Sequence, residues 1–142
     1  MRTKQIMRSL GVAAAGAALA VGVSAGTANA ASSWNLQYTQ GDLVGAHAWG
    51  TVSLSGGRYY VKVNIRDTKA DSHGARVYLR ATYQDGWGGD RTEVLSASGS
   101  GAENSYTWNF DDTVSWFEAK ECLTEQGADW TCADYSKIYG SP

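Results

Sequence analysis

The chain has 142 residues and a formal net charge of −2, with 12 Lys and Arg against 14 Asp and Glu. This length fits one domain, and the acidic balance disfavours a nucleic-acid partner, because phosphate binding relies on clustered Lys and Arg. No helical period of apolar residues is visible in the interior of the chain, which argues against a helical fold.

Residues 1–30 have the layout of an export signal: a basic stretch, an apolar run at 10–23, and a small-residue stretch before Ala31. The apolar run is shorter than the roughly 20 residues that span a bilayer as a helix, so we favour a cleaved signal over a membrane anchor. Cleavage between Ala30 and Ala31 would release one domain, residues 31–142. We expect this domain to be secreted, extracellular and without a membrane span.

Cleavage would leave nine basic and fourteen acidic residues, a formal charge of −5, and both cysteines. An even number of cysteines in a secreted chain predicts one disulfide, Cys122–Cys132. The short loop between them predicts a stabilisation of about 2.5–3 kcal/mol. We expect no metal there, because two cysteines without a nearby histidine pair do not complete a tetrahedral set.

Apolar and polar residues alternate along much of the remaining chain, which is typical of half-buried strands. Strands are predicted at 34–39, 46–54, 58–66, 76–83, 92–98, 106–110, 114–123 and 130–139. About eight short strands at regular spacing favour an all-β fold, an antiparallel sandwich or barrel. We expect the sandwich, Ig-like or jelly-roll-like, with the disulfide joining the last two strands.

Antiparallel neighbours place alternate loops at opposite ends of such a fold. We expect loops 40–43, 67–74, 99–104 and 124–129 at one end, and loops 55–57, 85–90 and 111–113 at the other. A strand of ten residues separates the two ends by roughly 30 Å. Acidic residues from opposite ends therefore cannot form one site.

The second end combines four aspartates with an indole on a Gly-rich loop. These residues are Asp85, Trp87, Asp90, Asp111 and Asp112. A sugar ring could stack on Trp87 while the acids accept its hydroxyl hydrogens, or a calcium ion could take the carboxylate oxygens. The alternative is that Trp87 folds back onto the core and the acids are merely solvated. Calcium is the one cofactor that this pattern suggests.

The outward sides of the third and fourth predicted strands carry five bases and two tyrosines, which we expect on one sheet surface. These residues are Arg58, Tyr60, Lys62, Arg66, Arg76, Tyr78 and Arg80. Tyr and Arg are enriched in interface hot spots, so this surface is a candidate for binding a partner. The alternative is cation–π stacking that simply covers the sheet. On the second strand, His47, Trp49 and Thr51 share a face that is solvent-exposed or meets a partner.

The overall layout resembles the small secreted β-sandwich proteins common in actinobacteria. The resemblance rests on the signal ending Ala28-Asn29-Ala30 and on a C-terminal hairpin with Cys122, Trp130, Cys132 and Tyr135. It implies fold and compartment more than activity. Some such proteins serve as accessory subunits of extracellular assemblies, which we take as an analogy for this chain.

Catalytic patterns are weak. The sequence has no nucleophile elbow, no H-E-x-x-H and no phosphate loop. Asp111 and Asp112 would point to opposite faces if the strand continued through them, so they could not flank one glycosidic bond. Our first hypothesis is therefore a secreted, non-enzymatic binding module for a protein or a cell-surface polymer. The alternatives are a carbohydrate- or calcium-binding domain, and a small secreted hydrolase.

Overall fold

A computed structural model describes residues 30–84 and 90–141. The predicted export signal lies outside the described residues, except for the exposed Ala30 at its end. Two members of the acidic loop end, Asp85 and Trp87, also lie outside them. Among the described residues, no helix has the length and apolar character needed to cross a membrane.

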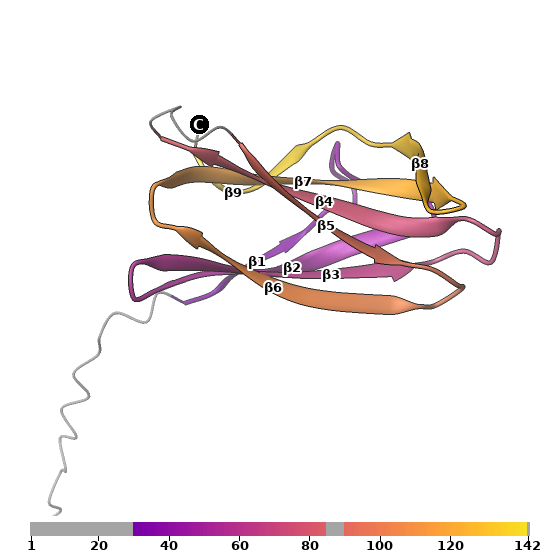
Figure 1. Cartoon of the computed structure of the whole chain (residues 1–142), viewed down its shortest axis with the longest axis horizontal. Coiled ribbons are helices and arrows are strands. Elements are labelled where there is room, and N and C mark those ends of the chain that lie inside the picture. Colours follow the sequence, from indigo (N-terminus) through magenta and orange to yellow (C-terminus); the bar gives the residue numbers. More distant parts are fainter. Residues whose placement is uncertain (1–29, 85–89, 142) are drawn as a thin grey trace, which may run out of the picture.

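The described chain forms nine strands in two antiparallel sheets that face each other (Figure 1). The strands are β1 (Ser32–Asn35), β2 (Ala46–Ser55), β3 (Arg58–Asp67), β4 (Gly74–Tyr83), β5 (Arg91–Ala97), β6 (Glu103–Asp111), β7 (Val114–Glu125), β8 (Ala128–Cys132) and β9 (Ser136–Gly140). Sheet A has the order β1-β2-β3-β6. Sheet B has the order β5-β4-β7-β8, and β9 pairs with another part of β7. The predicted all-β sandwich is confirmed.

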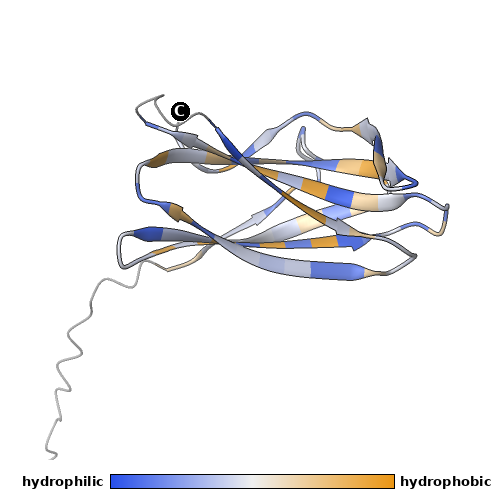
Figure 2. Ribbon diagram, viewed as in Figure 1, coloured by the Kyte–Doolittle hydropathy of each residue, from blue (hydrophilic) through white to orange (hydrophobic). Residues whose placement is uncertain are grey.

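The core lies between the two sheets and follows the predicted alternation (Figure 2). In β3, Val61, Val63 and Ile65 are fully buried, and in β4, Val77 and Leu79 are about equally buried. Inward side chains from both sheets therefore share one apolar layer, as expected for a sandwich.

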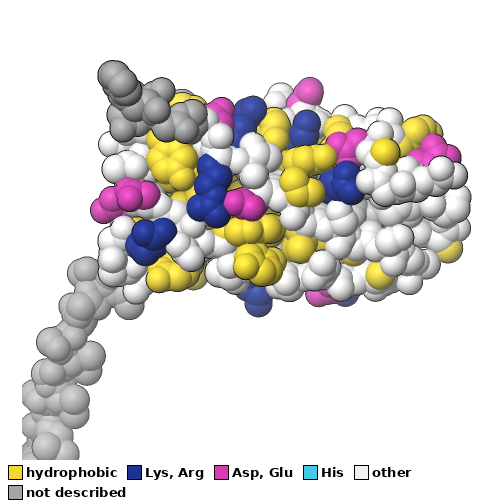
Figure 3. Space-filling model, viewed as in Figure 1, with side chains coloured by type: hydrophobic (Ala, Val, Ile, Leu, Met, Phe, Trp, Pro, Cys, Tyr) yellow, Lys and Arg dark blue, Asp and Glu magenta, His cyan; other side chains and the backbone are white. Residues whose placement is uncertain are grey.

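Hydrophobic side chains reach the surface along the edge where β5 faces β6 (Figure 3). Tyr106 has the same strand parity as the buried Phe110, yet 54% of it is exposed, because β6 is an edge strand of sheet A. Hydrogen bonds from Asn104 Nδ2 to the Ser96 carbonyl and from Arg91 to the Asn109 carbonyl join the two sheets at this edge.

The first predicted strand is too long. The chain leaves sheet A after Leu36, where the Thr39 N–H donates to the Leu36 carbonyl in a turn. A strand over 34–39 would point Tyr38 to the same side as Trp34 and Leu36, but Tyr38 is 90% exposed and has a φ of 66°. The turn interrupts the two-residue alternation of the strand, so the alternation no longer predicts the direction of the Tyr38 side chain.

The last predicted strand, 130–139, is in fact two strands, β8 and β9, that pair with different parts of β7. Between these two pairings, the Glu121 N–H donates to the Gly41 carbonyl. The loop at 40–43 thus lies beside the middle of β7 and not at the expected end of the sandwich. Gly41 is required there, because a Cβ would lie 2.8 Å from the Ala119 carbonyl oxygen.

Other loops meet as predicted. The buried Asp67 accepts N–H groups from Lys69 and Gly99 and so joins the loops at 67–74 and 99–104. At the opposite end, the Gln84 N–H donates to the Thr113 carbonyl. The separation of the two ends, which limits which residues can form one site, therefore holds for these loops.

The predicted disulfide joins Cys122 of β7 to Cys132 of β8, which pair directly in the sheet. Replacing both cysteines by alanine should lower the free energy of unfolding by about 3 kcal/mol, because the unfolded chain loses a loop constraint. Urea denaturation of the double variant and of the oxidised protein measures this difference. A change below about 1 kcal/mol would show that β7 and β8 need no covalent link.

Candidate functional site

The predicted basic surface does not exist as one face. Strand β3 belongs to sheet A and β4 to sheet B, because the segment at 67–74 crosses between the sheets instead of closing a hairpin. The outward parity was right for both strands. The sandwich nevertheless separates the predicted residues onto its two outer surfaces: Arg58, Tyr60, Lys62 and Arg66 on sheet A, and Arg76, Tyr78 and Arg80 on sheet B.

On sheet B, the predicted residues contact other parts of this chain. Asp129 accepts hydrogen bonds from Arg76 at 2.8 Å and from the Tyr78 hydroxyl at 2.5 Å. Arg80 pairs with Glu118 at 2.7 Å and lies 3.8 Å from the ring centre of Tyr135. Burial, helped by Asp129, raises the pKa of Tyr78. These contacts match the alternative in which cations and tyrosines cover the sheet.

At the acidic loop end, Asp90, Asp111 and Asp112 are all exposed. The Thr113 N–H donates to Asp111 Oδ1 at 3.0 Å, and this hydrogen bond lowers the pKa of the carboxyl group. With Asp85 and Trp87 outside the described residues, a sugar or calcium site at this end stays a prediction.

Asp129 also lies near the disulfide, within 4.8 Å of both sulfur atoms. The two sulfurs are bonded to each other, so they do not offer thiolate ligands to a metal.

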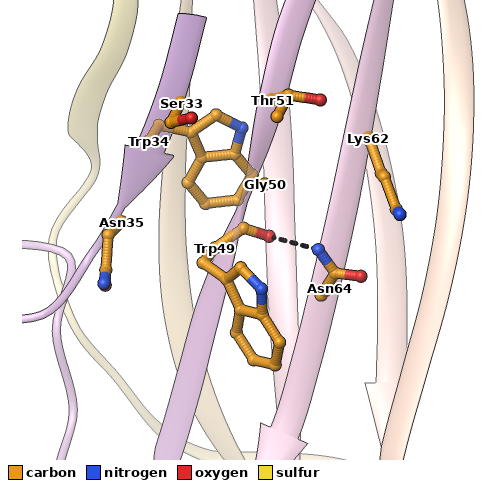
Figure 4. A pocket seen from close by; sticks show the side chains of 8 residues that line it. All are labelled: Ser33, Trp34, Asn35, Trp49, Gly50, Thr51, Lys62 and Asn64. Carbon is orange, nitrogen blue, oxygen red and sulfur yellow. Dashed lines mark hydrogen bonds between the residues drawn. The ribbon is translucent and has the colours of Figure 1, made fainter.

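A different site lies on the outer surface of sheet A. It is a hollow of about 460 Å³ whose floor is formed by β1, β2 and β3 (Figure 4). Its lining residues are Ser33, Trp34, Asn35, Trp49, Gly50, Thr51, Lys62 and Asn64. The volume falls within the range typical of small-ligand sites. We call this feature the sheet A hollow.

The sheet A hollow forms beside a glycine in the middle of β2. Gly50 pairs with Trp34 of β1 and with Val63 of β3. A Cβ at this position would lie 1.8 Å from the Lys62 carbonyl oxygen and 3.0 Å from the Trp34 ring. Only glycine permits this close approach of backbone and indole. Gly50 therefore helps to set the shape of the hollow.

One wall of the sheet A hollow is the half-buried indole of Trp49. The ring stacks on His47 with a centroid distance of 4.7 Å, and the Arg66 guanidinium lies 5.8 Å from its centre. Arg66 is held in turn by Glu103 at 2.7 Å. These contacts fix the orientation of the indole before any ligand arrives, which limits the entropy lost on binding.

The rest of the wall is polar. The amide Nδ2 of Asn64 donates to the Trp49 carbonyl at 3.1 Å, shown as the dashed line in Figure 4. Ser33, Thr51 and Lys62 add hydroxyl and ammonium groups. No carboxylate is among the eight residues that line the hollow. The hollow can thus donate and accept hydrogen bonds, but it lacks the paired acids of glycoside hydrolysis.

Trp34 is 6% exposed, and its Nε1 has no hydrogen-bond partner among the described residues. In Figure 4 this nitrogen is on the side of the ring nearest Thr51. An indole N–H buried without an acceptor costs about 1–3 kcal/mol, and such groups are rare in folded proteins. The nitrogen atom is itself buried and Trp34 packs in the core cluster, so a ligand in the hollow would not contact this donor as the ring stands.

Sequence reasoning found part of this site. The shared face of His47, Trp49 and Thr51 and the outward position of Lys62 were predicted. Ser33, Asn35 and Asn64 were not chosen, although strand parity places Asn64 on the same side as Lys62. The missing information was the pairing of β1 with β2, which brings Ser33 and Asn35 opposite Thr51 and Trp49.

No protein-family model matches this chain, and no curated protein is detectably similar to it.

Proposed function

We propose that this protein is an extracellular, non-catalytic binding module that holds a saccharide of a cell-surface polymer in the sheet A hollow. One observation carries the proposal: a fixed indole, Trp49, and a set of amide, hydroxyl and ammonium groups line the same hollow. Sugars present an apolar face of C–H groups and a rim of hydroxyls, so they suit this combination.

The chemistry of the lining favours a saccharide over the other partners considered. A protein partner would favour an apolar centre with a polar rim, whereas here polar groups surround the half-buried indole of Trp49. The lining carries no carboxylate and so lacks the pair of acids used in glycoside hydrolysis; the proposal is therefore for binding without hydrolysis. The predicted export signal is consistent with an extracellular polymer as ligand.

Replacing Trp49 by alanine should weaken saccharide binding by at least about tenfold, or about 1.4 kcal/mol, because the stacking surface is lost. The measurement is co-sedimentation with insoluble cellulose, chitin, xylan and bacterial peptidoglycan, followed by calorimetry with oligosaccharides of the polymer retained. Far-ultraviolet circular dichroism verifies that the variant is folded.

Trp130→Ala is the matched control, since Trp130 is a 57% exposed tryptophan on β8 of sheet B. It should bind like the unchanged protein. The proposal fails if the protein sediments with none of these polymers. It also fails if the two tryptophan variants lose affinity equally, since that would place the ligand elsewhere.

A further inference from the structure

A second hollow, of about 380 Å³, lies next to the sheet A hollow, between residues 37–45 and the first residues of β2. Tyr38, Asp42, Val44 and His47 are among its lining residues. Tyr38 and Val44 are 90% and 73% exposed, so this hollow offers apolar surface to solvent. We call it the Tyr38 hollow.

The two hollows share a wall. His47 lines the Tyr38 hollow and stacks on Trp49, which lines the sheet A hollow. The His47 Nε2 also lies 3.1 Å from the Oδ1 of Asn35, another residue of the sheet A hollow. From Ala46 in one hollow to Thr51 in the other, strand β2 covers about 17 Å. This length exceeds that of a single sugar ring.

The backbone holds Tyr38 in its exposed position. Its φ of 66° lies in the left-handed region, which is costly for a residue with a bulky side chain. The Tyr38 N–H donates to Asp42 Oδ2 at 2.9 Å, and the Leu43 N–H donates to the buried Glu121 at 2.7 Å. A strained residue that is held in place while its ring stays in solvent suggests a role for that ring outside the core.

We infer that the two hollows form one binding groove for a linear polysaccharide, with Trp49 and Tyr38 contacting different sugar units of the same chain. The inference rests on the proposed function and extends it from a single saccharide to a polymer. It follows from the shared His47–Asn35 wall and from one aromatic ring in each hollow, the half-buried Trp49 and the exposed Tyr38.

The test compares affinity across oligosaccharide length. Calorimetry with cello-, chito- and xylo-oligosaccharides, from disaccharide to hexasaccharide, should show a rise of at least about tenfold in affinity with length in the series that binds. Tyr38→Asn removes the ring without adding strain, because asparagine tolerates positive φ. This variant should bind the disaccharide like the unchanged protein and lose most of the gain with length. Trp49→Ala should weaken binding at every length.

Tyr106→Ser, at the edge between β5 and β6, is the control for loss of an exposed aromatic and should change nothing. The inference is overturned if affinity is independent of length, or if Tyr38→Asn weakens the disaccharide as much as the hexasaccharide. Either result leaves the single-saccharide proposal standing, provided that Trp49→Ala still lowers affinity. Failure of all three series and of peptidoglycan fragments to bind overturns both. Binding to a polymer preparation that disappears after protease treatment would identify a protein partner and also overturn both.

Discussion

Raising the pH from about 4.5 to above about 8 should lower the free energy of unfolding, and Glu121→Gln should remove most of this pH dependence. Glu121 is fully buried in β7. Its Oε1 accepts the Ala48 N–H at 2.6 Å and its Oε2 accepts the Leu43 N–H at 2.7 Å. Burial, with a smaller contribution from the nearby Asp42, raises its pKa from 4.5 to about 8, and the two N–H groups offset part of this rise.

The sign follows from proton binding. Between pH 4.5 and about 8, the folded protein keeps the Glu121 proton and the unfolded chain has lost it. The stability contribution of this group is therefore complete below the unfolded pKa and declines as pH rises to the folded pKa. The slope is about 1.4 kcal/mol per pH unit, so the loss reaches as much as about 5 kcal/mol.

Urea denaturation at several pH values measures this slope in the unchanged protein and in Glu121→Gln. The glutamine does not titrate, so its slope across this window should be much flatter. The Glu121→Gln variant should also be less stable than the unchanged protein near pH 5, by about 1–3 kcal/mol. The glutamine NH₂ group would face one of the two backbone N–H donors and could not accept its hydrogen bond. If the free energy of unfolding changed with pH equally in the two proteins, Glu121 would not be the source of the pH dependence.

Phe117→Ala should lower the free energy of unfolding by about 3–5 kcal/mol. Phe117 is fully buried in β7, and its ring meets Phe110 of sheet A edge-on at a centroid distance of 5.0 Å. The Phe117 ring also meets the Tyr59 ring of β3 edge-on, at a centroid distance of 5.5 Å. The substitution would leave a cavity where the two sheets meet, and it would remove aromatic contacts worth about 0.5–1.5 kcal/mol each.

Thermal and urea unfolding measure this loss, with Phe117→Leu and Tyr106→Ala as comparisons. The leucine retains most of the buried volume and should cost less than about 1.5 kcal/mol. Tyr106→Ala should change the free energy of unfolding by no more than about 0.5 kcal/mol, because Tyr106 is exposed and surface substitutions rarely have larger effects. A Phe117→Ala cost similar to that of Tyr106→Ala would mean that the sheets do not pack on this ring.

Several features of the site could not be predicted because they depend on segments far apart in the sequence. Glu121 shares strand parity with the buried Phe117, but its hydrogen-bond partners Leu43 and Ala48 are distant in the chain. The direction of Tyr38 depends on a turn after Leu36, and turns break the period on which strand predictions rest. The Tyr38 hollow was therefore invisible to sequence patterns alone.

The sequence by itself determined the fold class, the inward faces of the long strands and the disulfide, since strand periodicity and paired cysteines are local signals. Only the tertiary structure decided which strands share a sheet. The crossing at 67–74 separated the predicted basic surface into two, and the pairing of β1 with β2 created the sheet A hollow. Periodicity states which side of a strand is buried, whereas sheet membership depends on long-range pairing that no local pattern encodes.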